Sequence, residues 1–253
     1  WDNEKGSPLL FYSMEFLEKF KKLNHVYDHV DLAMRYGSPS IKSAVEKINQ
    51  SGVQKLKLFN LYPQYAESTT KTAIEEVQKY LDPNIELEFL PYFYSNADYL
   101  NSMTQSLESY KGFDHTLFSY HGLPESHIKK LDQTGKCLTN NCCEALDKTR
   151  LNYCYRAQCY HTTKLITERL QIKNWSYSFQ SRFGKKWVKP FTDLEVERLA
   201  QSGVKRLLVI SPAFVTDCLE TLEELHIGLK ESFLEAGGEE LIVAPCLNAN
   251  DDW

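Results

Sequence analysis

The sequence contains no long apolar run and no excess of positive charge. No stretch approaches the roughly 20 consecutive apolar residues that a membrane-spanning helix needs. The first residues, WDNEKGSPLL, lack the charged-then-apolar pattern of a secretory signal peptide. The 34 acidic residues outnumber the 29 basic ones and both are mixed along the chain, so no basic stripe predicts nucleic-acid binding. We therefore expect a cytoplasmic protein without a nucleic-acid partner.

The sequence does contain a moderate share of apolar residues and many aromatic ones. Of its 253 residues, 42% are hydrophobic, which is enough to form one large core or two smaller ones. Aromatic side chains make up 13%, a share that suits either a thick core or a cleft for a flat apolar ligand. Composition alone favours the core.

Short runs rich in β-branched and aromatic residues alternate with stretches of helical periodicity. This alternation predicts βαβ units with parallel strands, and therefore an α/β fold. The predicted strands are 29–34, 55–61, 85–92, 115–119, 175–179, 206–211 and 240–244. The predicted helices are 7–23, 40–48, 69–80, 97–109, 162–170, 193–201 and 218–236. Nearly continuous apolar strands such as RLLVIS at 206–211 predict sheets covered by helices on both faces.

A new helix and strand after residue 95 predict a second α/β unit. We expect a first unit over residues 1–94 and a second over 95–253, with a cysteine-rich insert at about 130–160 in the second. In open α/β sheets, ligands bind beyond the carboxyl ends of the strands. The residues at those places are Arg35, Tyr36, 62–65, His121, 180–182 and 212–220. Five separate loops therefore offer polar or aromatic groups to one edge.

His121 lies in the segment LFSYHGLP, just after a predicted strand and before a Gly-Leu-Pro turn. An imidazole in such a position can bind a metal ion or move a proton near neutral pH. The alternative is a loop histidine that hydrogen-bonds a neighbouring carbonyl. Position alone favours this alternative.

Glu220 and Glu224 are four residues apart on a predicted helix that follows a strand, so they share one face. Paired carboxylates can bind a divalent cation or relay protons. They can equally form a solvated helix face, and without other information this is the more frequent outcome.

Two further segments combine residue types that suit a large planar anion. LYPQYAESTT at 61–70 places two tyrosines around a proline before a helix start, where backbone N–H groups could hold an anion. FQSRFGKKWVKPFTD at 179–193 combines aromatic and basic side chains, which would suit an aromatic ligand that carries carboxylates. The alternative for this segment is a solvated surface loop with one buried tryptophan.

Taken together, these segments resemble the ferrochelatase family, and the resemblance covers essentially the whole chain. The motifs that match in order are GSP at 6–8, Arg35 with Tyr36, YPQY at 62–65, the SxHGLP set at 119–124, FQSRFG at 179–184, Asp217 with Glu220 and Thr221, and LNAN at 247–250. The resemblance implies two Rossmann-like, chelatase-type domains, each a parallel sheet flanked by helices, with the porphyrin in the cleft between them. It also implies that the last residues return towards the first domain.

The resemblance further implies a reaction and a set of roles. Ferrous iron, as substrate, enters protoporphyrin IX to give protoheme and two protons, the terminal step of heme biosynthesis. His121 and Glu220 would face each other across the macrocycle, with Glu224 continuing an acidic line. We assign the base to His121 and iron delivery to Glu220, although the sequence also allows the reverse. The residues expected to bind the porphyrin are Arg35, Tyr36, Tyr65, Ser181 and Trp187.

Three alternatives to this function stay open from the sequence. The porphyrin could be coproporphyrin III, or the enzyme could be another tetrapyrrole metal chelatase. A third reading is non-enzymatic: a porphyrin or heme carrier that has kept the cleft. The presence of both His121 and Glu220 argues against a carrier, because a carrier needs neither a base nor a metal relay.

The sequence departs from the family pattern at two places besides the insert. The family chain normally begins with an apolar strand and a lip segment, and neither precedes Trp1 here. We therefore expect part of the porphyrin pocket to be absent from this chain. Cys218 stands where many relatives have a histidine, and we expect it to be a small packed residue.

Five of the seven cysteines lie between residues 137 and 159. A cytoplasmic setting disfavours disulfides, and closely spaced thiolates suit zinc or an iron–sulfur cluster, or no metal at all. Some ferrochelatases carry a 2Fe–2S cluster on an internal insert, so the resemblance favours that cofactor. Four ligands are needed from Cys137, Cys142, Cys143, Cys154 and Cys159. We expect Cys137, Cys154 and Cys159 to be three of them and Cys142 or Cys143 to be the fourth, because only one of two adjacent residues usually points inward.

The expected partners are a porphyrin and ferrous iron. The resemblance is also compatible with a peripheral position at the inner face of the membrane and with a homodimer. The sequence by itself decides neither of these.

Overall fold

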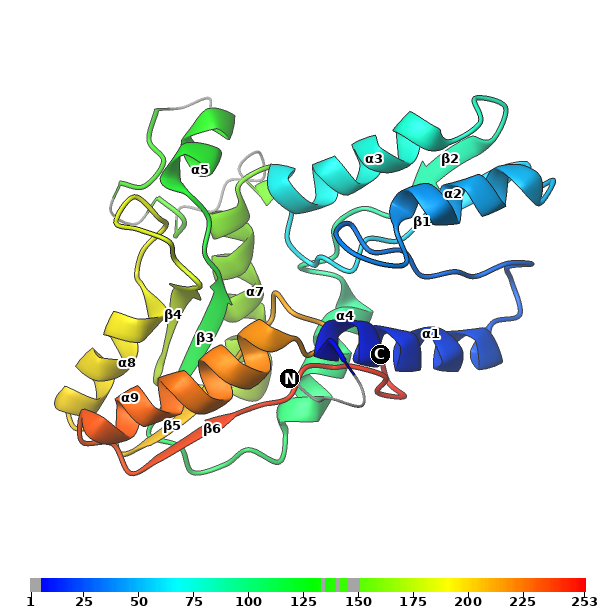
Figure 1. The fold of residues 1–253 in the computed structure, drawn as a ribbon. Coiled ribbons are helices and arrows are strands. Elements are labelled where there is room, and N and C mark those ends of the chain that lie inside the picture. Colours follow the sequence, from blue (N-terminus) through cyan, green and yellow to red (C-terminus); the bar gives the residue numbers. More distant parts are fainter. Residues whose placement is uncertain (1–5, 133–134, 140–141, 145–150) are drawn as a thin grey trace.

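The described strands of the chain form two separate parallel sheets. The computed structural model describes residues 6–132, 135–139, 142–144 and 151–253. The smaller sheet pairs β1 (Lys55–Leu58) with β2 (Glu86–Phe89). The larger sheet has the order β4-β3-β5-β6, with β3 at His115–His121, β4 at Trp175–Gln180, β5 at Arg206–Ile210 and β6 at Glu240–Val243. Figure 1 shows the two groups of strands with helices packed against each. The predicted α/β fold with parallel sheets is confirmed.

The smaller sheet is covered by two amphipathic helices. Helix α2 (Ile41–Gln50) begins at Ser40, whose hydroxyl accepts a hydrogen bond from the N–H of Ser43, an ordinary N-cap. Helix α3 (Thr72–Tyr80) continues a short π-helix, η1 (Glu67–Lys71). Val45 and Val77 from the two helices are buried together beside the partly buried side chains of β1 and β2. Their periodic apolar positions form this small core.

The larger sheet has helices on both faces, as its continuous apolar strands predict. Leu117 and Leu207 pack into one layer with helix α8 (Thr192–Gln201) and helix α9 (Lys230–Glu235). The next residues along the strands, Phe118 and Leu208, face the other layer, which contains helix α4 (Ala97–Leu107) and helix α7 (Tyr155–Leu170). Successive side chains of a strand point to opposite faces, so both layers are built from the same two strands.

Two predictions about secondary structure are wrong. The predicted strand 29–34 is not formed: residues 29–33 have no strand structure, and Met34 makes only an isolated β-bridge to Ser40. The Met34 N–H donates to the Pro39 carbonyl at 2.7 Å. A strand exists only where a neighbouring strand accepts its hydrogen bonds. The sequence analysis also missed helix α5 (Glu125–Leu131) and placed the start of α7 seven residues too late.

The C-terminal segment packs on the first helix, α1 (Pro8–Leu23). The ring of Trp253 lies 6.3 Å from that of Phe16 on α1 and 5.5 Å from that of Phe93, centroid to centroid. The Lys19 ammonium on α1 donates to the carbonyl of Ala249 at 2.6 Å. The end of the chain therefore contacts α1, which precedes the smaller sheet in the sequence, and Phe93, which follows β2.

An ion pair joins the part of the chain around the smaller sheet to α5. The Glu67 carboxylate accepts from Lys130 on α5 at 2.7 Å and from Lys71 at 2.8 Å. Hydrogen bonds from these two ammonium groups lower the pKa of Glu67 to about 2. The carboxylate is therefore charged at neutral and mildly acidic pH.

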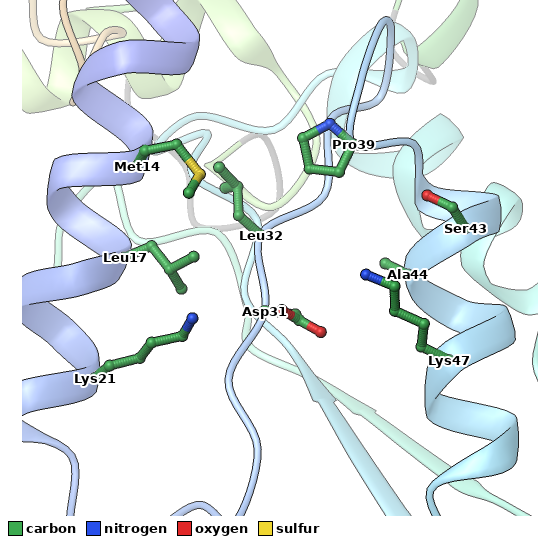
Figure 2. Close-up of a pocket in the computed structure, with 9 residues that line it drawn as sticks. All are labelled: Met14, Leu17, Lys21, Asp31, Leu32, Pro39, Ser43, Ala44 and Lys47. Atoms are coloured by element: carbon green, nitrogen blue, oxygen red, sulfur yellow. The ribbon is translucent and has the colours of Figure 1, made fainter.

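A small cavity lies between α1 and α2 (Figure 2), with a volume of about 140 Å³. Lys21 on α1 and Lys47 on α2 extend towards it, and Asp31 lies between them. Pockets for drug-sized ligands measure roughly 300–1,000 Å³. This cavity is too small for a tetrapyrrole, and none of the predicted site residues lines it.

Within the described residues, no helix combines the length and the apolar character needed to span a bilayer. This agrees with the absence of a long apolar run in the sequence.

We predict that Phe233→Ala lowers the free energy of unfolding by about 3–5 kcal/mol. The Phe233 side chain is fully buried on α9 between the larger sheet and α8, so truncation leaves a cavity. Its neighbour Leu234 is 41% exposed, and Leu234→Ala is the matched control, expected to cost under about 1 kcal/mol. Urea denaturation measures both, and equal losses would contradict this account of the core.

Candidate active site

His121 is the last residue of β3, the strand that pairs with both β4 and β5. Its side chain is half-buried, and its Nδ1 lies 2.7 Å from the carbonyl oxygen of Gly122. A carbonyl oxygen can only accept a hydrogen bond, so Nδ1 carries the proton in the neutral imidazole. The lone pair is therefore on Nε2, which is free to take a proton or to bind a metal ion.

The peptide unit after His121 is held from two sides. The Gly122 N–H donates to the Gln180 carbonyl at 2.8 Å, and the His121 carbonyl accepts from the Tyr155 hydroxyl at 2.9 Å. Gly122 itself has no room for a side chain, because a Cβ there would lie 2.6 Å from the Gln180 carbonyl oxygen and 3.3 Å from Cε3 of Trp187. The predicted site residue Trp187 therefore packs directly against the turn that follows His121.

A buried polar chain runs from β3 through the end of β4. The Ser119 hydroxyl donates to Oε1 of Gln180 at 2.7 Å and also contacts the Thr192 hydroxyl at 3.0 Å. Nε2 of Gln180 donates to the backbone carbonyl of Glu220 at 3.1 Å. Because the backbone carbonyl of Glu220 can only accept a hydrogen bond, the nitrogen end of the Gln180 amide must face Glu220, and the oxygen end faces the Ser119 hydroxyl. The strand that carries His121 is thus tied to the segment that carries Glu220.

Glu220 begins a ten-residue π-helix, η2 (Glu220–Leu229), rather than the ordinary helix predicted from the sequence. This wider i→i+5 winding is rare and is frequently found at functional sites. A buried aspartate holds its start: the Asp217 carboxylate accepts from the Thr221 hydroxyl at 2.8 Å and from the Asn248 amide at 2.7 Å. The DxxET and LNAN motifs therefore meet in one hydrogen-bonded cluster.

Glu224 lies on η2, but it does not form a solvated face with Glu220. Its carboxylate accepts from the Ser181 N–H at 2.8 Å, the Ser181 hydroxyl at 2.5 Å and the Gln180 amide at 3.4 Å. Ser181 has a left-handed backbone (φ 59°), which directs its N–H and hydroxyl towards the same carboxylate. The Glu224 carboxylate is therefore held in a fixed position one turn from Glu220.

Cys218 is buried two residues before Glu220. Burial first, and then the neighbouring Glu220 carboxylate with which it hydrogen-bonds, raise the pKa of this thiol to about 12. In this environment the thiol is protonated, packs among buried side chains and donates a weak hydrogen bond.

The other predicted porphyrin-binding residues come from the part of the chain around the smaller sheet. Tyr36 is 75% exposed, and the Arg35 guanidinium lies 4.7 Å from the centroid of its ring. The backbone N–H of Tyr65 donates to Oε1 of the buried Gln158 on α7 at 2.7 Å. Tyr65 is thus anchored to a helix of the larger-sheet layer.

Four of the five clustered cysteines contact one another through their sulfur atoms. The sulfurs of Cys142 and Cys143 are 3.8 Å apart, and both accept from the Arg156 guanidinium, at 3.5 and 3.4 Å. Cys143 and Cys137 each donate to Cys154. This hydrogen-bonded group of Cys137, Cys142, Cys143 and Cys154 is called the thiol cluster below.

Cys154 has the most acidic thiol of the cluster. It is the N-cap of α7, and the hydrogen bond from Cys143, with backbone N–H groups of Ala157 and Arg156, lowers its pKa to about 6 despite burial. Cys143 donates its proton to that sulfur, and this hydrogen bond together with burial raises its own pKa. Burial and the nearby Cys154 raise the pKa of Cys137 to about 12.

Cys159 lies apart from these hydrogen bonds. It is fully buried on α7, where its thiol hydrogen-bonds the Tyr155 hydroxyl and burial raises its pKa. Across the described ranges, no three His, Cys, Asp or Glu side chains converge closely enough to form a metal site.

Comparison with known proteins identifies the family. The ferrochelatase family model matches residues 2–253. The chain belongs to the ferrochelatase family. Ferrochelatase from Ectopseudomonas mendocina (strain ymp) is 45% identical over all of this chain and 76% of its own length, and that from Azotobacter vinelandii is 43% identical over 98% of this chain. The chain is therefore a ferrochelatase, an enzyme of heme synthesis, as the resemblance implied.

Solved chelatase structures support the fold of this ferrochelatase. SirB from Bacillus subtilis with Fe³⁺ matches with a TM-score of 0.62 over 95% of this chain and 83% of SirB, at 12% identity. A cobalt complex of the sirohydrochlorin chelatase SirB from subspecies spizizenii matches with a TM-score of 0.57 at 13% identity. At such identities the likeness shows the chelatase-type fold alone.

Sequence reasoning missed two residues of this ferrochelatase that hold site residues in place. Tyr155 and Gln158 lie in and beside the cysteine-rich insert, where the cysteines dominate the pattern. A signal was present: a tyrosine and a glutamine three residues apart share one helix face with Thr162, also buried, which is an unusual number of polar groups for a helix interior.

We predict that Gly122→Ala reduces iron insertion at least tenfold, because the new Cβ displaces the Gln180 carbonyl or the Trp187 ring and with them the turn after His121. Gly184→Ala is the matched control, since nothing lies within 4 Å of its Cβ position. Anaerobic heme formation measures both variants. Equal activity of the two would show that the tight approach at Gly122 is unimportant.

Proposed function

We propose that this ferrochelatase inserts ferrous iron into protoporphyrin IX, with His121 as the base and Glu220 as the residue that delivers iron. The observation that carries the proposal is the hydrogen bond from Nδ1 of His121 to Gly122, which leaves the Nε2 lone pair available. The Gln180 amide supports it further, because it couples the His121 strand to the backbone of Glu220.

The chemistry needs a proton acceptor and an iron donor. Insertion forms four Fe–N bonds and releases the two pyrrole N–H protons, so the charge of the incoming Fe²⁺ is balanced. Nε2 of His121 would accept these protons one at a time and pass them to water. The Glu220 carboxylate, an oxygen ligand for a divalent ion, would release Fe²⁺ to the ring. Glu224, held by Ser181, would continue the acidic line along η2.

The porphyrin would be held by residues from both parts of the chain. Nε of Arg35 is buried without a hydrogen-bond partner among the described residues, which leaves it available to a carboxylate of the ligand. Tyr36, Tyr65 and Trp187 would supply flat apolar surface against the ring. Ser181 would act here through Glu224, which it contacts, more than through the porphyrin itself.

We divide the chain at residue 94 into a first domain (1–94) and a second (95–253). The division is supported by the two separate sheets, with β2 ending before it and β3 beginning after it. The last residues of the chain would contact the first domain again, where Trp253 packs against α1. The porphyrin would then lie where the two domains meet.

We predict that His121→Ala and Glu220→Gln each lower heme formation by at least about a hundredfold. The assay is anaerobic incubation with ferrous iron and protoporphyrin IX. Glu223→Gln is the matched control for Glu220→Gln, since Glu223 lies on the same helix and is exposed. Wild-type turnover by either site variant would contradict the assignment.

The same assay separates the alternative substrates and functions. Coproporphyrin III run beside protoporphyrin IX decides the porphyrin, and cobalt run beside iron tests another chelatase activity. A porphyrin or heme carrier would bind the ring without any metal insertion. The proposal requires iron insertion into protoporphyrin IX to be the fastest of these reactions.

We further propose that the thiol cluster binds a 2Fe–2S cluster, which the resemblance favours over zinc. Four cysteine sulfurs match the ligand number of such a cluster, and all four are joined by sulfur contacts. The Arg156 guanidinium beside Cys142 and Cys143 would offset their charge. The thiols do not yet converge as ligands, so binding would draw them together and release their protons. Cys159, which was expected from the sequence to be a ligand, would instead be the fifth, non-ligating cysteine, because its thiol bonds Tyr155, and both Cys142 and Cys143 would be ligands.

We predict that the anaerobically purified protein shows absorption bands above about 400 nm, together with bound iron and sulfide. Cys143→Ser should abolish these bands and Cys159→Ser should keep them, because only the first sulfur contacts the other thiols. Absence of iron and sulfide in the wild type would exclude the cluster. Stoichiometric zinc would favour the alternative.

A cytoplasmic location, a peripheral position at the membrane and a homodimer stay predictions. Apolar side chains at and beyond the end of α1 support some surface contact, since Leu23 is 64% exposed and Val26 is 80% exposed. Sedimentation of the purified protein with and without lipid vesicles would test both associations.

A further inference from the structure

The first turn of α7 hydrogen-bonds two parts of the candidate active site, the end of β3 at His121 and the YPQY segment at Tyr65. Tyr155 and Gln158 lie on this turn, directly after Cys154, and both side chains are buried. Figure 1 shows α7 in the middle of the molecule, beside β3. The Tyr155 hydroxyl donates to the carbonyl of His121 at 2.9 Å, and Oε1 of Gln158 accepts from the N–H of Tyr65 at 2.7 Å.

The bond from Tyr155 acts on the orientation of the His121 imidazole. It holds the carbonyl of the same peptide unit whose N–H, on Gly122, donates to Gln180 at 2.8 Å. A peptide unit is planar, so hydrogen bonds at its two ends fix the direction of the plane. The imidazole is bonded to the next carbonyl, that of Gly122, and therefore follows this plane. Loss of the hydroxyl would free one end of the plane and leave a buried carbonyl unsatisfied.

The hydrogen bonds of the Gln158 side chain fix the position of the Tyr65 backbone. Its amide nitrogen donates to the carbonyl of Leu151 at 2.7 Å, which leaves the oxygen to accept from the Tyr65 N–H. One turn further along α7, Thr162 accepts from the Gln64 amide at 3.3 Å. The YPQY segment is thus held by α7 at two successive residues.

We propose that Tyr155 and Gln158 are positioning residues, through which the first turn of α7 places His121 for proton transfer and Tyr65 for porphyrin binding. The inference rests on the proposed function, since it assigns different steps of that reaction to the two contacts. The inference also gives the cysteine-rich insert a role. Cys154 is the N-cap of the helical turn that carries both residues, so a shift of the thiol cluster would move the groups that hold His121 and Tyr65.

The experiment compares matched variants by steady-state kinetics with ferrous iron and protoporphyrin IX. Tyr155→Phe removes the hydroxyl that donates to His121 and that also hydrogen-bonds the Cys159 thiol. Tyr120→Phe is its control, because Tyr120 is equally buried and its hydroxyl bonds Thr163 on the same helix at 2.7 Å. Gln158→Leu removes the bond to Tyr65, and Thr163→Val is its control, since it removes a buried polar group of α7 that contacts no site residue.

We expect Tyr155→Phe to lower kcat about tenfold or more with an unchanged KM for porphyrin, because a small misplacement of the base slows the chemical step. Gln158→Leu should raise the KM for porphyrin about fivefold or more, with a smaller change in kcat. Tyr155→Phe and Gln158→Leu each lose two hydrogen bonds and their controls lose one, so we expect each variant to show a somewhat larger fall in Tm than its control while it stays folded at the assay temperature.

Two results would overturn the inference. One is a loss of kcat in Tyr120→Phe equal to that in Tyr155→Phe. The other is a porphyrin KM in Gln158→Leu equal to that in Thr163→Val. If Tyr155→Phe does not fold, the Gln158 comparison decides by itself, with porphyrin fluorescence quenching as a second measure of affinity. A wild-type protein that makes no heme refutes the proposed function instead, so the two failures are distinguishable.

Discussion

The hydrogen bonds of the Gln180 amide are the interaction on which the rest of the site depends. The side chain is almost fully buried, and its oxygen accepts from Ser119 on β3 while its nitrogen donates to the backbone of Glu220. Its backbone carbonyl, in turn, accepts from Gly122. One residue therefore sets the distance between the strand that carries His121 and the helix that carries Glu220. In a buried setting, each of these polar groups would be costly to leave unpaired, so the arrangement is stable only as a whole.

Each of the two described π-helices begins with a glutamate in a segment that follows a strand. These glutamates are Glu67 in η1 and Glu220 in η2. The wider winding is less favourable than an α-helix, and tertiary contacts compensate for it. At η2 the compensation comes from the buried Asp217, bonded to Thr221 and Asn248. At η1 it comes from ion pairs of Glu67 with lysines. The same kind of helix therefore begins at a candidate-site carboxylate, Glu220, in one place and at an ion-paired carboxylate, Glu67, in the other.

Helix α7 connects three features that the sequence presents as unrelated. It begins at the cysteine of lowest pKa, it holds the YPQY segment, and it supports the last peptide of β3. Its interior is polar for a buried helix, with Gln158, Thr162 and Thr163 all inaccessible to solvent. Each of these groups is bonded to another element, which explains why the helix tolerates them. A polar helix core of this kind positions partners more specifically than apolar packing does.

The local sequence determined most of the elements and the family of this protein. Apolar runs such as RLLVIS form central strands because both faces are buried, and the ordered motifs from YPQY to LNAN identify a ferrochelatase. Tertiary structure decided the rest. Residues 29–33 stay unpaired because no described strand lies beside them. The wide winding at Glu220 depends on the bond between Asp217 and Asn248, which are 31 residues apart. The contact of Glu224 with Ser181 spans 43 residues, and the hydrogen bond from Tyr155 to His121 spans 34. Periodicity reports which face of an element is buried, but a polar hydrogen bond depends on which group lies opposite, and only the packed fold supplies that group.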